Sequence, residues 1–108
     1  MSFEVKTISV FEKQFKRLAK KYPSLKPKLF KLIQLLKISP KQGNPLGKNC
    51  YKIRLPIKSK GKGKSGGGRI ITNVAYTTET VYLLSIYDKS EKLSLSNTEL
   101  IELLRDTP

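Results

Sequence analysis

YKIRLPIKSKGKGKSGGGRIITNVAYTTETVYLLSIYD, the stretch of residues 51–88, decides the fold of this chain. Its first segment, Tyr51–Leu55, alternates apolar and basic side chains, which is the pattern of a half-buried β-strand. Arg69–Tyr76 and Val81–Asp88 are rich in β-branched and aromatic residues, and the turn Thr77–Thr80 separates them. The stretch therefore predicts a meander of three consecutive antiparallel strands.

Upstream, one strand and two helices are expected. Phe3–Ile8 has the apolar spacing of a short strand, and Ser9 followed by Glu12 matches a capping box at the start of a helix. Tyr22-Pro23 ends that helix, because proline disfavours helical geometry in the residue before it. The apolar positions of this helix are Phe11, Phe15, Leu18, Ala19 and Tyr22.

The second helix is expected to start after Ser24 as its cap and to stop at Ser39-Pro40. Its apolar stripe consists of Leu25, Leu29, Leu32, Ile33 and Leu36. A turn-rich link, Lys41–Asn49, leads from there to the meander.

A third helix closes the chain. Ser96 and Glu99 form another capping box, followed by apolar residues at Leu100, Ile101, Leu103 and Leu104. The order is an N-terminal strand, a two-helix hairpin, a three-stranded antiparallel meander and a short C-terminal helix. This order predicts an α+β fold with a largely antiparallel sheet, formed by residues 1–108 as a single domain.

The charge balance limits the classes of molecule that this protein is expected to bind. Twenty-two Lys and Arg against eight Asp and Glu leave a net charge of +14, which attracts polyanions. No apolar run reaches the ~20 residues of a membrane span, and no secretory signal is recognisable. The single cysteine, Cys50, forms no internal disulfide. We therefore expect a cytoplasmic protein with no membrane partner.

The loop Lys58–Gly68 combines glycines with lysines, which suits a phosphate backbone. Its lysines are Lys58, Lys60, Lys62 and Lys64. Gly63-Lys64-Ser65 resembles part of a nucleotide-binding P-loop, but position 58 is Lys where that motif needs Gly, and a strand follows instead of a helix. A solvated hairpin loop is the plainer interpretation.

The chain has no His, one Cys and scattered carboxylates, so the sequence predicts no metal site and no cofactor. Basic residues can still cleave RNA, because the substrate carries its own nucleophile, the 2′-hydroxyl. Lys52 and Arg54 share one strand face, and an antiparallel sheet would bring Arg69, Tyr87 and Lys89 near them. A solvated basic face and a half-buried strand tyrosine are the alternatives.

The runs Tyr51–Leu55, Lys60–Ile71 and Val81–Glu91 resemble the RelE/ParE toxins, in particular the RelE/HigB-like branch, and the resemblance extends over about 3–104. It implies a type II toxin that enters the ribosomal A site, cleaves mRNA as a metal-independent endoribonuclease and is neutralised by an antitoxin protein.

The resemblance also implies roles for individual residues. Lys52, Arg54 and Lys64 would bind RNA phosphates, together with the other loop lysines, and Arg69 would stabilise the transition state. Tyr87 and Lys89 would orient the nucleophile and assist proton transfer, with Lys92 in support. Some relatives carry a His or Glu as candidate base; this chain offers only Glu91, which leaves the base unassigned.

Two other functions stay open at this stage. A ParE-like gyrase inhibitor shares the fold without cleaving RNA, and a non-catalytic RNA-binding protein needs only the positive charge. For a toxin, the charge predicts an antitoxin with an acidic amphipathic segment that covers the basic cleft or displaces the Ser96–Leu104 helix.

Overall fold

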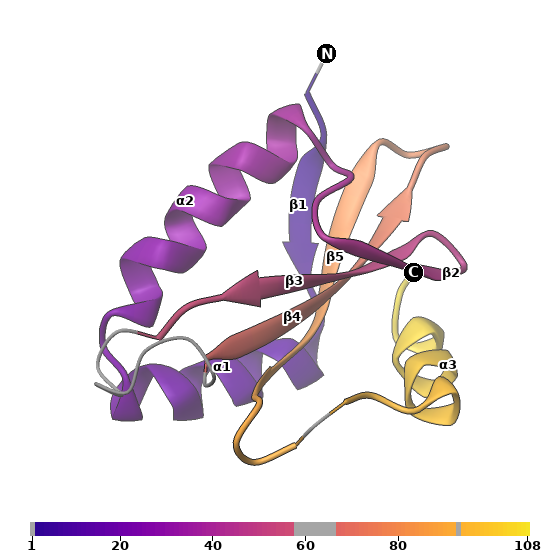
Figure 1. Cartoon of the computed structure of the whole chain (residues 1–108). Coiled ribbons are helices and arrows are strands. Elements are labelled where there is room, and N and C mark those ends of the chain that lie inside the picture. Colours follow the sequence, from indigo (N-terminus) through magenta and orange to yellow (C-terminus); the bar gives the residue numbers. More distant parts are fainter. Residues whose placement is uncertain (1, 58–66, 93) are drawn as a thin grey trace.

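The computed structural model of the protein describes residues 2–57, 67–92 and 94–108 (Figure 1). Its centre is a five-stranded sheet in the order β1-β5-β4-β3-β2. The predicted meander is present as β3 (Cys50–Leu55), β4 (Gly68–Ala75) and β5 (Thr80–Asp88), each antiparallel to the next. The predicted N-terminal strand is β1 (Glu4–Thr7), which pairs with β5 in parallel.

One strand was not expected. The segment predicted as a turn-rich link contains β2 (Asn44–Gly47), which pairs with β3 at the edge of the sheet. The reversal between Gly47 and Cys50 uses Lys48 and Asn49, both with positive φ, as a two-residue hairpin turn requires. All four residues of β2 are exposed, so the strand has no alternating apolar pattern that sequence could reveal.

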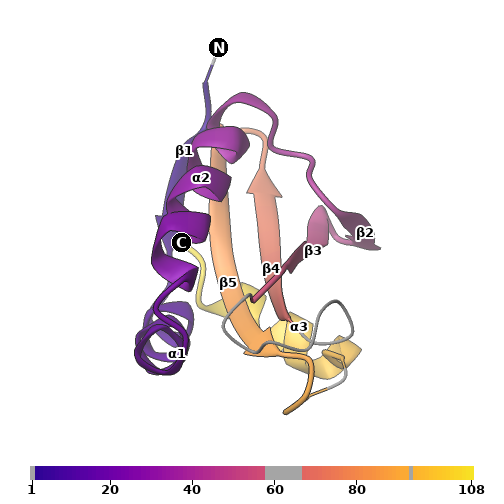
Figure 2. The ribbon, with the colours of Figure 1, turned by 60° about the vertical axis from the view of Figure 1, so that its left-hand side comes forward.

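The predicted helical hairpin is formed by α1 (Ser9–Lys21) and α2 (Leu25–Ile38), which lie on one side of the sheet (Figures 1 and 2). Between these helices and the sheet lies the apolar core. On the sheet side, Ile53, Ile70 and Ile86 are cross-strand partners and are all buried. The helices contribute their fully buried side chains Phe11, Leu18, Leu25 and Leu36.

Two predicted helix caps are wrong. In α1, Ile8 occupies the N-cap position and no side chain caps the helix; the Glu12 carboxylate accepts a hydrogen bond from Thr7 instead of forming a box with Ser9. The helix follows β1 after a single residue, which shifts the cap by one position. In α2, Ser24 is the N-cap residue but its backbone is already helical, so its hydroxyl makes no cap hydrogen bond. The hydroxyl is buried and has no partner within residues 2–57, 67–92 and 94–108.

The capping box of the last helix is confirmed. α3 (Asn97–Arg105) begins where the Ser96 hydroxyl accepts from the Glu99 amide at 3.1 Å and the Glu99 carboxylate accepts from the Ser96 amide at 2.9 Å. Leu100 and Leu103 are buried, as predicted, whereas Ile101 is exposed. Within the described ranges, no helix is both long and apolar enough to cross a membrane.

Candidate functional site

A row of three side chains crosses the sheet at one end. Arg54 of β3 is the direct partner of Arg69 of β4, and Arg69 is the direct partner of Tyr87 of β5. Direct cross-strand partners project from the same face with Cβ atoms roughly 5 Å apart. The adjacent row, Ile53, Ile70 and Ile86, points into the core, so the Arg54–Arg69–Tyr87 row occupies the opposite face.

The two arginines of this row have no counter-ion in the part of the chain that the structure describes. Arg69 is 8% exposed, and its guanidinium donates to the Gly68 carbonyl at 3.0 Å. Arg54 is exposed beside it. Among the described residues, neither arginine forms an ion pair with a carboxylate. A buried cation without an anionic partner is costly, and two adjacent ones repel each other, so this pair is suited to an anion supplied from outside.

Tyr87 is the third member of the row, and its hydroxyl is available as a hydrogen-bond donor. The residue is 5% exposed, and its hydroxyl has no hydrogen-bond partner in the part of the chain that the structure describes. Burial raises the pKa of Tyr87, while the positive charges of Arg69 and Lys92 lower it and Glu99 raises it further. The raised pKa keeps this phenol protonated at neutral pH, so it is a hydrogen-bond donor rather than a base.

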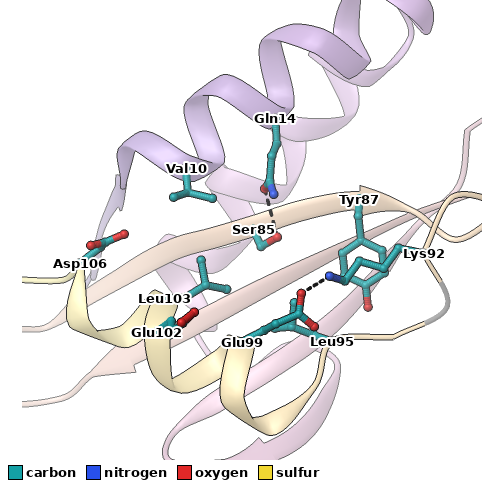
Figure 3. Close-up of a pocket in the computed structure, with 10 residues that line it drawn as sticks. All are labelled: Val10, Gln14, Ser85, Tyr87, Lys92, Leu95, Glu99, Glu102, Leu103 and Asp106. Atoms are coloured by element: carbon teal, nitrogen blue, oxygen red, sulfur yellow. Dashed lines mark hydrogen bonds and ion pairs between the residues drawn. The ribbon is translucent and has the colours of Figure 1, made fainter.

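A cavity of about 340 Å³ lies beside this row, between α1, the end of β5 and α3 (Figure 3). Tyr87 and Lys92 line it from the β5 side. Three carboxylates line it from α3 and the residue that follows: Glu99, Glu102 and Asp106. The cavity therefore places carboxylates near the phenol, and α3 stands over the face that carries the basic row.

Lys92 and Glu99 form an ion pair across this cavity (Figure 3). The Lys92 ammonium, with help from the Ser96 amide, lowers the pKa of Glu99 from 4.5 to about 2. Sequence reasoning assigned Glu99 only to the capping box and missed its place in the site. The box fixed its position on α3, but nothing local indicated that α3 would pack against Tyr87.

Gln14 is a second residue that the sequence did not indicate. Its side-chain carbonyl accepts hydrogen bonds from the Ser85 hydroxyl at 3.0 Å and the Ile86 amide at 2.9 Å. Because β1 pairs with β5 only as far as Leu83, the following part of the β5 edge has no strand beside it. Gln14 supplies the hydrogen-bond acceptor for the Ile86 amide at that edge and so holds the backbone next to Tyr87 in place.

The turn after β5 is held to α1. Asp88 is fully buried, accepts from the Ser90 amide at 3.0 Å and from the Tyr22 hydroxyl at 3.4 Å. Glu91 forms ion pairs with Arg17 at 3.2 Å and Lys21 at 3.8 Å. The one carboxylate that the sequence offered as a base is thus engaged with α1 and does not line the cavity.

Two of the remaining predicted site residues, Lys52 and Lys89, lie in the described strands and turn near the row. Lys52 is partly exposed, two residues before Arg54 on β3. Lys89 is partly exposed, and its amide donates to the Gly67 carbonyl at 3.0 Å. Lys58, Lys60, Lys62 and Lys64 lie outside the described residues. Gly68, the first residue of β4, pairs with Leu55 next to the two arginines.

Metal ligands do not gather within the described ranges, where no group of three or more His, Cys, Asp and Glu side chains is arranged to hold an ion. The groups available for chemistry are two guanidiniums, a protonated phenol, lysines and the three carboxylates of the cavity, of which Glu99 is ion-paired with Lys92. Such a set can bind a phosphate, stabilise added negative charge on it and donate hydrogen bonds.

Comparison with known proteins supports the fold. No known family profile matches the chain. The chain is similar to the solved structure of the E. coli toxin RelE, determined as a mutant in the free state, with a TM-score of 0.63 and 18% sequence identity. The similarity covers 98% of this chain and 94% of the RelE chain. The predicted RelE-like α+β fold is thus confirmed.

Proposed function

We propose that this protein is the toxin of a type II toxin-antitoxin system, of the RelE/HigB-like branch, and that it cleaves mRNA in the ribosomal A site. Residues 1–108 would act as one toxin domain in the cytoplasm, with no metal or other cofactor. One observation supports this proposal above the others. Arg69 is buried between Arg54 and Tyr87 and has no carboxylate partner among the described residues, which leaves it available for a phosphate.

The chemistry follows from the positions of these groups. The 2′-oxygen of a nucleotide attacks the adjacent phosphorus, the bond to the 5′-oxygen of the next nucleotide breaks, and a cyclic phosphate and a free 5′-hydroxyl result. Arg69, with Arg54, would stabilise the extra negative charge on the phosphorane. The Tyr87 phenol, protonated because burial raises its pKa, would donate a hydrogen bond or proton to an oxygen of the scissile phosphate.

Lysines would supply the rest of the interface. Lys89 follows Tyr87 by two residues and would assist the proton transfer, while Lys52 would bind a neighbouring phosphate. Lys64, Lys58, Lys60 and Lys62 belong to the loop between β3 and β4, and we propose them as contacts to the RNA backbone. The group that removes the 2′-hydroxyl proton is unassigned.

Helix α3 lies beside Tyr87, and we propose that it controls access to this side of the site. Tyr87 and Arg69 are more than nine-tenths buried, and Glu99 of α3 holds Lys92 in an ion pair beside the phenol. We propose that the cognate antitoxin uses an acidic amphipathic segment to cover the basic face or to take the place of α3. A complex in which α3 and the basic face both stay free would contradict this.

The function can be tested by induced expression with growth recorded and mRNA cuts mapped by primer extension. The parent chain would be compared with Arg69→Ala and with Arg105→Ala, which removes an exposed arginine from α3. We expect growth arrest and codon-associated cuts from the parent and from Arg105→Ala, and neither from Arg69→Ala. Arrest without RNA cuts would instead indicate gyrase inhibition, and purified protein that binds RNA without cutting it would indicate a binding protein.

A further inference from the structure

Helix α2 has large apolar side chains on its outer face as well as on the face that packs against the sheet. Leu25, Leu29, Leu32 and Leu36 are buried against the sheet, as in any amphipathic helix. The opposite face would ordinarily be polar, yet Phe30 is 64% exposed, Ile38 is 77% exposed and Leu35 is 46% exposed. These are among the large exposed apolar side chains of the described residues, and α2 carries three of them.

The three side chains lie on the outer half of α2, with exposed Lys31 and Gln34 between them, and we define the outer α2 surface as Phe30, Leu35 and Ile38. Phe30 and Ile38 are eight residues apart, so they lie on the same side of the helix about two turns, or ~12 Å, from each other. Leu35 lies on one flank of that line. Figure 1 shows α2 at the periphery of the molecule, with no described element beyond it. Three large apolar side chains exposed on the outer side of one helix indicate a contact site.

The charges on α2 point to the chemistry of the partner. Every ionisable side chain of this helix is a lysine: Lys26, Lys28, Lys31 and Lys37. Lys31 is exposed and lies on the outer face among Phe30, Leu35 and Ile38. Among the described residues, Lys31 has no carboxylate partner. A partner that covers the apolar side chains must therefore also supply a carboxylate to Lys31.

The need for a carboxylate beside Lys31 distinguishes between the possible partners of this surface. A second copy of the chain would place lysines of one α2 against lysines of the other, between two molecules that each carry +14. A lipid bilayer would have to accept the ammonium of Lys31 in the middle of the inserted face. An amphipathic helix with apolar residues in one stripe and carboxylates beside it meets both needs.

We propose that the outer α2 surface is a docking site for an acidic amphipathic helix of a partner protein. The surface lies on the helical side of the sheet, away from the Arg54–Arg69–Tyr87 row. This inference goes beyond the proposed function, because binding of a partner at the outer α2 surface needs neither RNA nor cleavage. In a toxin, it would let the partner hold α2 while leaving the site itself to a separate segment.

A defined peptide tests the surface directly. The probe is a synthetic helix of about 18 residues with leucines at helical spacing and glutamates elsewhere; its counterpart has lysines in place of the glutamates. Binding to the full chain would be followed by NMR chemical-shift mapping and by titration at about 0.15 M salt, where loose electrostatic attraction is screened. We expect saturable binding of the acidic peptide, with shifts concentrated on α2.

Matched variants locate the contact. Phe30→Glu combined with Ile38→Glu changes only exposed positions, so the fold should persist, and we expect the Kd to rise by roughly tenfold or more. Thr98→Glu adds a carboxylate at an exposed position of α3 and should leave the Kd within about twofold of the parent value. Lys31→Ala should weaken binding more than Lys20→Ala, an exposed lysine on α1 with the same charge change. Circular dichroism would confirm that all variants are folded.

Several outcomes would overturn the inference. These are equal binding of the acidic peptide to the Phe30→Glu/Ile38→Glu variant, shifts that map to α1 or to the open sheet face, and equal binding of the lysine peptide. Co-sedimentation with phosphatidylglycerol vesicles that is lost in the same variant, without peptide binding, would assign the surface to membranes. Arg69→Ala does not change α2, so it tests RNA cleavage without affecting peptide binding. Failure of the peptide-binding prediction can therefore be distinguished from failure of the nuclease proposal.

Discussion

Arg69 of β4 lies directly across from Tyr87 of β5, and both side chains are more than nine-tenths buried although neither has a side-chain partner among the described residues. Burial of an unpaired guanidinium and of an unpaired phenol destabilises a fold. Such a pair is typical of residues kept for what they bind rather than for stability.

The first prediction separates activity from stability at Arg69. Arg69→Met should abolish RNA cleavage, with a loss of about 10²–10³-fold or more, because a donor to the phosphorane is removed. The same change should leave the free energy of unfolding unchanged or raise it, because an uncompensated buried charge is replaced by an apolar side chain of similar length. Urea denaturation and a primer-extension assay measure the two effects. A large loss of stability would mean that Arg69 is held by interactions that support the fold.

Tyr87→Phe tests the phenol in the same manner. The hydroxyl is buried and has no hydrogen-bond partner among the residues that the structure describes, so its removal should change the free energy of unfolding by less than about 1 kcal/mol. Cleavage should fall by about 10²–10⁴-fold if the phenol assists proton transfer. Tyr82→Phe, another buried tyrosine of β5, is the matched control and should retain activity.

The pKa of Tyr87 gives a pH-dependent readout. Because the folded pKa is raised above 10, the contribution of this group to stability is fully present below pH 10 and is lost as the pH rises through the folded pKa. Ultraviolet titration of the parent should show late ionisation of Tyr87 and also of Tyr51, whose pKa is raised by its hydrogen bond with Tyr76. Tyr87→Phe should reduce the late absorbance change by the contribution of one tyrosine. A late absorbance change of undiminished size in Tyr87→Phe would mean that Tyr87 does not contribute to it.

The Lys92–Glu99 pair predicts the opposite pH dependence. The pKa of Glu99 is lowered from 4.5 to about 2, so its contribution is present above pH 4.5 and is lost as the pH falls through about 2. Glu99→Gln should therefore lower the Tm relative to the parent at neutral pH, with the difference shrinking in this acid window. Glu102→Gln, an exposed neighbour on α3, should show a smaller difference. If the Tm of the two variants depended on pH in the same way, the Lys92–Glu99 ion pair would not be what stabilises the packing of α3.

Gln14 is expected to matter through the backbone of β5. Gln14→Ala leaves the Ile86 amide without its acceptor and should cost about 1–3 kcal/mol, whereas Gln14→Glu keeps a carbonyl-type acceptor and should restore much of the loss. Gln34→Ala, at an exposed position of α2, should be nearly neutral. Chemical denaturation measures all three, and an equal loss for the alanine and glutamate variants would argue against the hydrogen bond as the cause.

Salt dependence tests the electrostatic argument as a whole. With +14 and unpaired arginines at the site, RNA binding should weaken linearly in a plot of log affinity against log salt, because each phosphate neutralised releases a counterion. Arg54→Ala should reduce the slope by roughly one phosphate contact. Binding that is unchanged between low and high salt would contradict the proposed role of the charge.

The sequence alone determined the parts of this protein that depend on local pattern. Alternation in Tyr51–Leu55, the turn between β4 and β5, Pro23 and Pro40 as helix ends, and the Ser96–Glu99 box each follow from neighbours a few residues apart, and all four are present. The same alternation put Lys52 and Arg54 on the face opposite to Ile53, where the structure has them. The box predicted for Ser9 failed because the start of α1 depends on β1 before it.

Only the tertiary structure decided which distant residues meet. The parallel pairing of β1 with β5 leaves an open strand edge that Gln14 satisfies, and the packing of α3 brings Glu99 to Lys92 and Tyr87. The burial of Arg69 and the exposure of Phe30 and Ile38 are likewise set by what packs around them. The physical reason is that strand order, register and helix docking depend on contacts between segments far apart in the chain, for which short-range periodicity carries no signal.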